Sequence, residues 1–130
     1  MGDRLLLVDA ANVVGSRPDG WWRDRAGAAA RLVAAIRGAV DDGRLGPPVL
    51  VVLEGAARAG VPEGDERGVR VAHAARSGDD ALVAAAGRSE LAVLLVTADR
   101  ALRDRVRAVG AGTVGPRHLL DRIGPPAAEG

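Results

Sequence analysis

Short apolar runs that end at an acidic residue are the feature that most constrains the fold. Leu5–Val8 is an uninterrupted apolar run followed at once by Asp9, and the run that begins at Val49 ends at Glu54. Apolar runs that do not alternate with polar residues are typical of strands buried on both faces, as in parallel sheets. The sequence therefore predicts buried parallel strands that carry carboxylates at their ends.

Segments with helical spacing of apolar residues separate these runs, so strands and helices alternate along the chain. This order predicts an α/β fold with three α/β/α layers and a mostly parallel, Rossmann-like sheet of about five strands. The stretch Gly55–Gly68 is rich in glycine and charge and is expected to be a loop. We expect residues 1–123 to form a single domain and residues 124–130 to be a disordered tail. The expected strands are Leu5–Val8, Val49–Glu54, Val69–His73, Ala92–Thr97 and a short strand in 112–115; the expected helices are Arg23–Asp42, one from Asp79 or Asp80, Arg100–Val109 and Pro116–Ile123.

Composition narrows the function classes. The 130-residue chain has no cysteine, which excludes disulfides and thiolate metal sites and favours a reducing compartment. No apolar segment approaches the ~20 residues that cross a membrane, and Asp9 interrupts the first apolar run, so neither an anchor nor a signal peptide is expected. We expect a cytoplasmic protein with no membrane association.

The charge pattern permits a nucleic-acid partner without demanding one. The formal net charge is only +1, but the basic residues are arginines. An arginine fork binds phosphate in a planar, bidentate manner, so such a surface can engage nucleic acid without a large net charge. The arginine and alanine bias of GC-rich genomes gives the same composition.

Acidic residues mark the ends of several expected strands. Asp9, Glu54 and Asp99 each follow a strand, and Asp79–Asp80 stands at the start of a helix beside the same edge. The carboxyl ends of parallel strands lie together, and ligands bind there. Clustered carboxylates repel one another unless a cation lies between them, and Mg²⁺ or Mn²⁺ prefers such oxygen ligands. The pattern predicts a metal site for phosphodiester hydrolysis.

Three stretches carry a resemblance to a known family: "VDAAN" after the first strand, "SGDDALVAAA" at a helix start and "VTADRALRDRV" late in the chain. In their order and spacing they resemble the NYN branch of the PIN-like ribonuclease superfamily, and within it the YacP-like branch, over roughly residues 5–123. The resemblance implies a PIN-like fold and a metal-dependent endoribonuclease acting on RNA. Two positions depart from the family pattern, since Ala10 replaces a common glycine and Glu54 a more common aspartate.

The resemblance also implies roles for individual residues. Asp9 is the first metal ligand, and Asn12 orients it or contacts the substrate. Asp80 matches the acid at the helix start, with Asp79 as the fallback. Asp99 is the late acid, and Thr97 is its supporting hydroxyl.

Arginine and tryptophan residues around the same edge are candidates for RNA contact. Trp21 and Trp22 are adjacent, so both cannot point into the core from one extended stretch. With Arg25 and other arginines nearby they form either a stacking surface with phosphate contacts or a lid on the following helix. The candidate RNA-binding residues are Arg17, Trp21, Trp22, Arg23, Arg58, Arg76 and Arg100.

Two other function classes remain open on sequence. The first is a binding module of the same fold that binds RNA or the ribosome with little catalysis, which the departures at Ala10 and Glu54 favour. The second is a metal-dependent phosphatase for a small phosphoester, although the chain lacks a DxDxT-type nucleophile motif. The sequence leaves the oligomeric state open, with a homodimer among the options.

Overall fold

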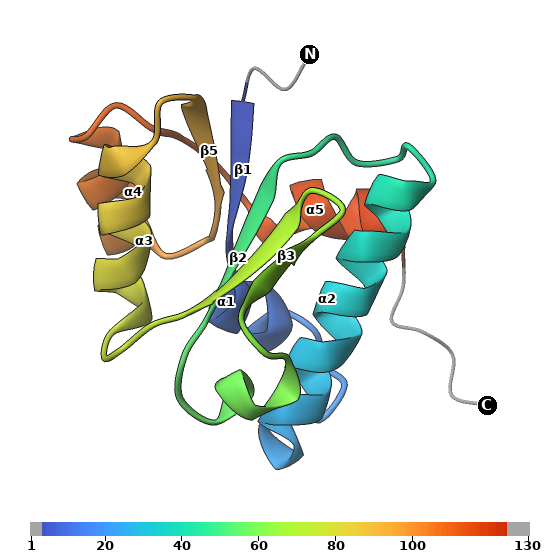
Figure 1. Cartoon of the computed structure of the whole chain (residues 1–130). Helices are drawn as coiled ribbons and strands as arrows, with labels where there is room; N and C mark the ends of the chain where they lie inside the picture. The colour runs from blue at the N-terminus through green and yellow to red at the C-terminus, as the bar shows by residue number, and fades with distance from the viewer. Residues whose placement is uncertain (1–3, 125–130) are drawn as a thin grey trace.

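A six-stranded sheet in the order β3-β4-β2-β1-β5-β6 organises the fold (Figure 1). The structure is a computed structural model and describes residues 4–124. All neighbouring strands run parallel except β3, which pairs with β4 in the antiparallel sense. The strands are β1 (Arg4–Asp9), β2 (Val49–Leu53), β3 (Gly64–Glu66), β4 (Val69–His73), β5 (Ala92–Val96) and β6 (Gly112–Val114).

Helices cover both faces of the sheet. The two faces have separate hydrophobic cores, one formed with α1, α2 and α5 and the other with α3 and α4. The predicted α/β fold with three layers and a mostly parallel sheet is thus confirmed. The α-helices are α1 (Ala10–Gly15), α2 (Arg25–Asp41), α3 (Gly78–Arg88), α4 (Arg100–Arg107) and α5 (Pro116–Ile123), and the 3₁₀ helices are η1 (Trp21–Arg23) and η2 (Gly55–Gly60).

Strand β1 shows why these runs lack alternation. Side chains of successive strand residues point to opposite faces, and both faces are covered here. Leu6 and Val8 pack with α2, whereas Leu7 packs with α3 and α4, and all three are buried. An apolar residue is therefore required at every position until Asp9, where the strand reaches the carboxyl edge of the sheet.

The sheet has one strand more than the expected five, and the extra strand lies inside the expected loop Gly55–Gly68. This part of the chain forms η2 and then β3, whose three residues are all exposed. Strand β3 is joined to β4 by a tight turn in which Arg67 and Gly68 both have positive φ angles. Because β3 buries no side chain, it gives no hydrophobic pattern to detect.

Of the expected tail, Gly124 is described and residues 125–130 lie outside the described residues. Within residues 4–124, no helix is long and apolar enough to cross a bilayer.

Packing of α4 onto the sheet gives a first testable prediction. Leu102→Ala removes a side chain that is fully buried in the core between α4 and the sheet, so the free energy of unfolding should fall by about 2–5 kcal/mol. Urea denaturation followed by circular dichroism measures it. Leu91→Ala is the matched control, because Leu91 is 38% exposed, and it should cost much less. Equal losses in the two variants would contradict the packing described here.

Candidate functional site

Asp9 lies at the carboxyl end of the central strand β1 and is only 6% exposed. Both of its carboxylate oxygens accept hydrogen bonds. Oδ1 accepts from the backbone N–H of Asn12 at 3.2 Å, which caps the N-terminus of α1, and Oδ2 accepts from the hydroxyl of Thr97 at 2.9 Å. The carboxylate is thus held by the start of α1, which follows β1 directly, and by the residue that follows the neighbouring strand β5.

Thr97 connects this carboxylate to the second predicted acid, Asp99. Thr97 is fully buried directly after β5, and its hydroxyl oxygen accepts a hydrogen bond from the backbone N–H of Asp99 at 3.1 Å. Asp99 in turn caps α4, because its Oδ1 accepts from the N–H of Leu102 at 2.9 Å. One hydroxyl therefore fixes the start of α4 relative to Asp9.

Asn12 holds the same two parts of the chain together from α1. Its side-chain Oδ1 accepts a hydrogen bond from the backbone N–H of Ala98 at 2.8 Å. Residues 97–99 are therefore bound to Asp9 and to Asn12 at once. Asn12 thus contacts Asp9 through its backbone N–H, whereas its side chain holds residue 98.

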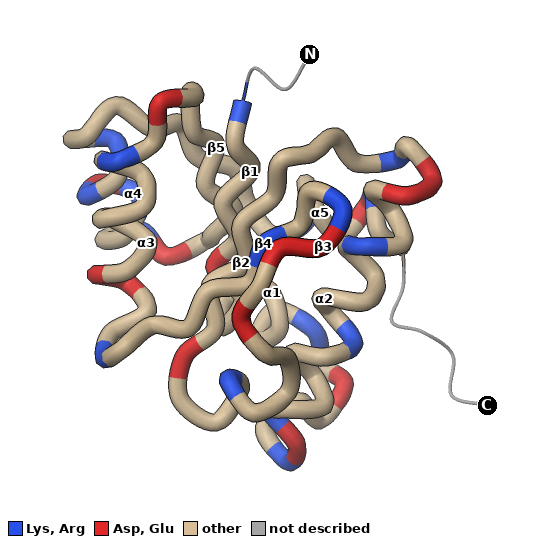
Figure 2. Tube along the Cα trace, in the orientation of Figure 1, with Lys and Arg blue, Asp and Glu red and all other residues tan. Residues whose placement is uncertain are grey.

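The electrostatics of the edge centre on Asp9. Burial raises the pKa of Asp9 above its ordinary value of 3.8, whereas the hydrogen bonds from Thr97 and Asn12 lower it. The negative charges of Asp79 and Glu54 raise the pKa of Asp9 further. These two carboxylates therefore lie close enough to Asp9 to interact electrostatically with its carboxylate. Figure 2 shows acidic segments at the carboxyl ends of the strands and at the start of α3.

Glu54 approaches the start of α3 through a gap left by a glycine. A Cβ atom placed on Gly78 would collide with Oε1 of Glu54. Gly78 is the first residue of α3, whose N-cap is Ser77, with its hydroxyl accepting from the N–H of Asp80 at 3.2 Å. The absence of a side chain at Gly78 brings the β2 acid up to the helix that carries Asp79.

The structure separates Asp79 from Asp80. The side chain of Asp80 is 72% exposed and pairs with Arg105 of α4 at 2.8 Å, whereas Asp79 is half-buried and acts on the pKa of Asp9. The motif resemblance assigns the role of helix-start metal ligand to Asp80, but the placement of the two side chains favours Asp79 for that role. Asp80 instead joins α3 to α4.

The acidic residues at this edge are of the chemical type that binds a hard divalent cation. They supply only oxygen donors, and the buried, charge-crowded Asp9 is a carboxylate that a cation would relieve. Within residues 4–124, however, no three His, Asp or Glu side chains lie close enough together to hold a metal ion among them. Mg²⁺ usually keeps several waters and binds one or two carboxylates, so a pair built on Asp9 fits it.

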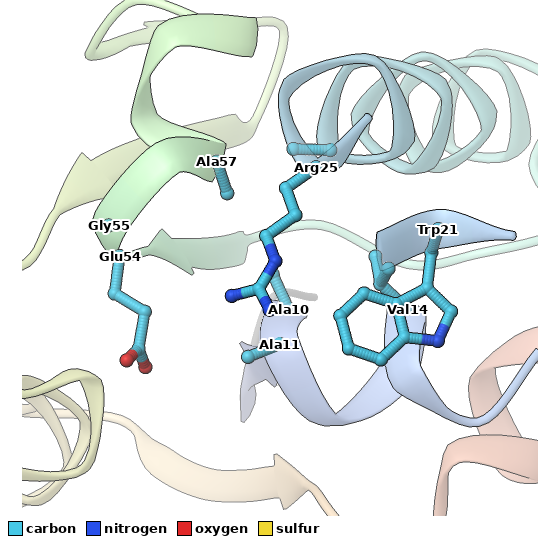
Figure 3. A pocket seen from close by; sticks show the side chains of 9 residues that line it. Ala10, Ala11, Val14, Trp21, Arg25, Glu54, Gly55 and Ala57 are labelled. Carbon is cyan, nitrogen blue, oxygen red and sulfur yellow. The ribbon is translucent and has the colours of Figure 1, made fainter. Parts of the chain in front are cut away.

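A cavity of about 130 Å³ opens beside the acidic edge (Figure 3). Glu54 borders it on one side and Trp21 on the other, and the Arg25 side chain reaches down between them. The guanidinium of Arg25 lies over the Trp21 ring, 5.3 Å from its centroid. The remaining lining residues are Ala10, Ala11, Val14, Ala29, Gly55 and Ala57.

The two tryptophans divide as expected, with one of them exposed. Trp22 is 55% exposed, and its ring lies edge-on to that of Trp21, with 6.0 Å between the centroids. The guanidinium of Arg23 lies 5.7 Å from the centroid of Trp22. Trp22 and Arg23 thus form an exposed aromatic and cationic surface next to the cavity.

The other candidate RNA-binding arginines differ in whether their side chains are engaged in hydrogen bonds within the fold. Arg17 donates to the carbonyl of Gly124 at 2.9 Å, and Arg58 donates to the carbonyl of Gly55 at 3.1 Å, so both brace the fold. Arg76 and Arg100 are exposed, at the approach to α3 and at the start of α4. These two are the better placed to meet an RNA backbone.

One supporting residue could not be identified from sequence. Arg103 lies on α4, whose sequence carries four arginines and gives no sign that one of them supports the site. Its Nε donates to the backbone carbonyl of Thr97 at 2.8 Å, so it supports the buried threonine from α4. By contrast, Ser77 had a readable signal, since a serine three residues before an acid is typical of a helix start.

Comparison with known proteins supports the fold. No protein-family model matches the sequence, and no curated protein matches it either. Among solved structures, the chain resembles the crystal structure of Rae1 (YacP) from Bacillus subtilis (W164L mutant). The TM-score is 0.66 at 20% sequence identity, covering 92% of this chain and 74% of that one. The resemblance to the YacP-like branch is thereby confirmed at the level of the fold.

The raised pKa of Asp9 predicts a pH dependence of stability. The folded state holds the Asp9 proton more tightly than the unfolded state does, so the stability gained from it is complete below pH 3.8 and is lost as pH rises through the folded-state pKa. With EDTA present, Asp9→Asn should therefore gain stability relative to the wild type as pH rises. Urea denaturation at several pH values measures this.

The control for that series is Asp65→Asn, which changes an exposed aspartate on β3. Its stability should run parallel to the wild type across the same pH range. If the stability of Asp9→Asn also ran parallel to that of the wild type, burial would not be raising the pKa of Asp9.

Proposed function

We propose that this chain is a divalent-metal-dependent endoribonuclease whose site is the carboxyl edge of the sheet around Asp9. The observation that carries the proposal is the Asp9 carboxylate itself. It is buried, its pKa is raised, and it is held by Thr97 and Asn12. Burying a carboxylate among other acids costs stability, and a bound cation would offset that cost.

In this proposal Asp9 and Asp79 hold the cation, Mg²⁺ or Mn²⁺, while Glu54 and Asp99 lie along the same edge outside its ligand set. When bound, the cation would activate a water and stabilise negative charge on the scissile phosphodiester. The chain's own residues act by position. The Thr97 hydroxyl and the backbone N–H of Asn12 fix the Asp9 carboxylate, and Arg103 holds the backbone carbonyl of Thr97.

Two further features support RNA as the substrate. The motifs at Asp9, Asp79–Asp80 and Asp99 resemble those of the YacP-like branch, and the fold resembles that of Rae1 (YacP). Exposed cationic and aromatic groups flank the site: Arg76 and Arg100 lie near the starts of α3 and α4, and Trp22 lies beside the cavity. Arginine contacts to phosphate and aromatic contacts to bases are what single-stranded RNA requires.

Adjacent acids on α3 provide a sharp test. Asp79→Asn and Asp9→Asn should each reduce Mn²⁺-dependent cleavage of end-labelled single-stranded RNA by about 100-fold or more, the scale seen when one electrostatic contact at a reacting centre is removed. EDTA should abolish cleavage by the wild type. Asp80→Asn is the matched control, because its carboxylate pairs with Arg105, and it should keep most of the activity.

The opposite ranking, with Asp80→Asn inactive and Asp79→Asn active, would overturn the assignment of the helix-start acid and leave the enzyme in place. RNA that stays intact with either metal, while binding is measurable, would overturn the enzyme.

The second candidate is an RNA- or ribosome-binding module with little catalysis. One observation favours it: among the described acids, Asp9 and Asp99 already use carboxylate oxygens to cap α1 and α4, and no three acids close around a common point. The same cleavage and binding measurements decide between the two.

A further inference from the structure

The cavity next to the acidic edge differs in chemistry from the edge itself. Much of its wall is apolar, with alanine residues from α1, α2 and η2 and Val14 of α1, and its polar groups are few: the Trp21 indole, the Arg25 guanidinium and the Glu54 carboxylate. Apolar walls with a few converging polar groups are typical of small-ligand sites. A flat, heteroaromatic group with an attached anion matches this lining.

The walls are fixed in place by close backbone packing. A Cβ atom on Gly60 would collide with the backbone carbonyl of Ala26, so η2 closes tightly on α2. The Trp21 ring packs against Gly15, where an added Cβ would lie 3.7 Å from the ring, and Trp22 supports it edge-on. The space between these walls exists because alanines occupy the positions that face it.

Arg25 is not placed there for the stability of α2. It is the first residue of that helix, where the helix dipole disfavours a cation. Among the described residues it forms no ion pair, and its contact is the face of Trp21. A cation in this position favours an anion that comes from outside the chain.

We propose that the cavity is a subsite for one unpaired nucleobase of an RNA strand, which stacks on the Arg25 guanidinium where that group lies over Trp21, while the N–H edge of the guanidinium contacts the nucleotide's phosphate. Aromatic rings and guanidinium planes are the groups on which unpaired RNA bases stack. Glu54 borders both the cavity and the acidic edge, so a base held here places its own backbone beside Asp9. The inference rests on the proposed function for the identity of the strand, and the binding site stands on the cavity alone.

The chain offers a direct optical test, because Trp21 and Trp22 are its only tryptophans. In Trp22→Phe the sole indole lines the cavity. Adding nucleoside 5′-monophosphates, up to millimolar concentrations and without metal, should quench its fluorescence with saturation. Ribose 5-phosphate, which has no base, should not. Equal quenching by ribose 5-phosphate would reduce the site to a phosphate contact and overturn the proposal, as would absence of quenching by all four monophosphates.

A matched pair of alanine substitutions locates the site. Ala11→Leu, made in the Trp22→Phe background, fills the cavity from an exposed position of α1 and should weaken monophosphate binding about tenfold or more, since stacking of one base is lost. Ala34→Leu, on an exposed position of α2 outside the cavity, should leave binding unchanged. Unaltered binding in folded Ala11→Leu protein would overturn the proposal.

The two proposals fail separately. Monophosphate binding uses no metal and no cleavage, so it persists if the chain is a binding module. Conversely, an active nuclease in which Ala11→Leu cleaves as the wild type does, and binds monophosphates equally well, retains the proposed function and loses the subsite.

Discussion

The hydrogen bond from the Thr97 hydroxyl to the Asp9 carboxylate is the contact on which the rest of the site depends. It joins the ends of the two adjacent strands β1 and β5 at the middle of the sheet. Asp9 caps α1 and Asp99, held by the same hydroxyl, caps α4, so helices on opposite faces start from one buried polar pair. Asp9 and Thr97 are the only polar residues buried within the described part of the chain.

This arrangement does not favour stability. A carboxylate removed from water, with Asp79 and Glu54 nearby, is disfavoured in its charged form, and its hydrogen bonds only partly compensate. Replacing such a group with an apolar residue would suit the core better. Residues that break the packing rules at the carboxyl edge of a parallel sheet are typical of functional sites, which is the physical ground for assigning a role to Asp9.

The elements that could be predicted from the sequence are those whose residue types are determined by burial. The central strands were found because both faces are covered, and the acids at their ends because a turn to solvent must follow. Strand β3 escaped detection because it is an exposed edge strand. The choice between Asp79 and Asp80 depends on rotation about α3, where consecutive residues point about 100° apart, and only the docked helix fixes that angle. The cavity escaped as well, because its walls come from α1, η1, α2 and η2, which are distant in sequence or separated by loops.

Ala10 shows how the structure changes the meaning of a sequence departure. From sequence, the alanine that stands next to Asp9 in place of a common glycine favoured a binding module with little catalysis. Asp9, however, receives its hydrogen bonds from Thr97 and from the backbone of Asn12, and neither contact involves the side chain of residue 10. That methyl group is buried and lines the cavity between Trp21 and Glu54 instead. The substitution therefore alters the shape of the cavity and leaves the support of the carboxylate intact.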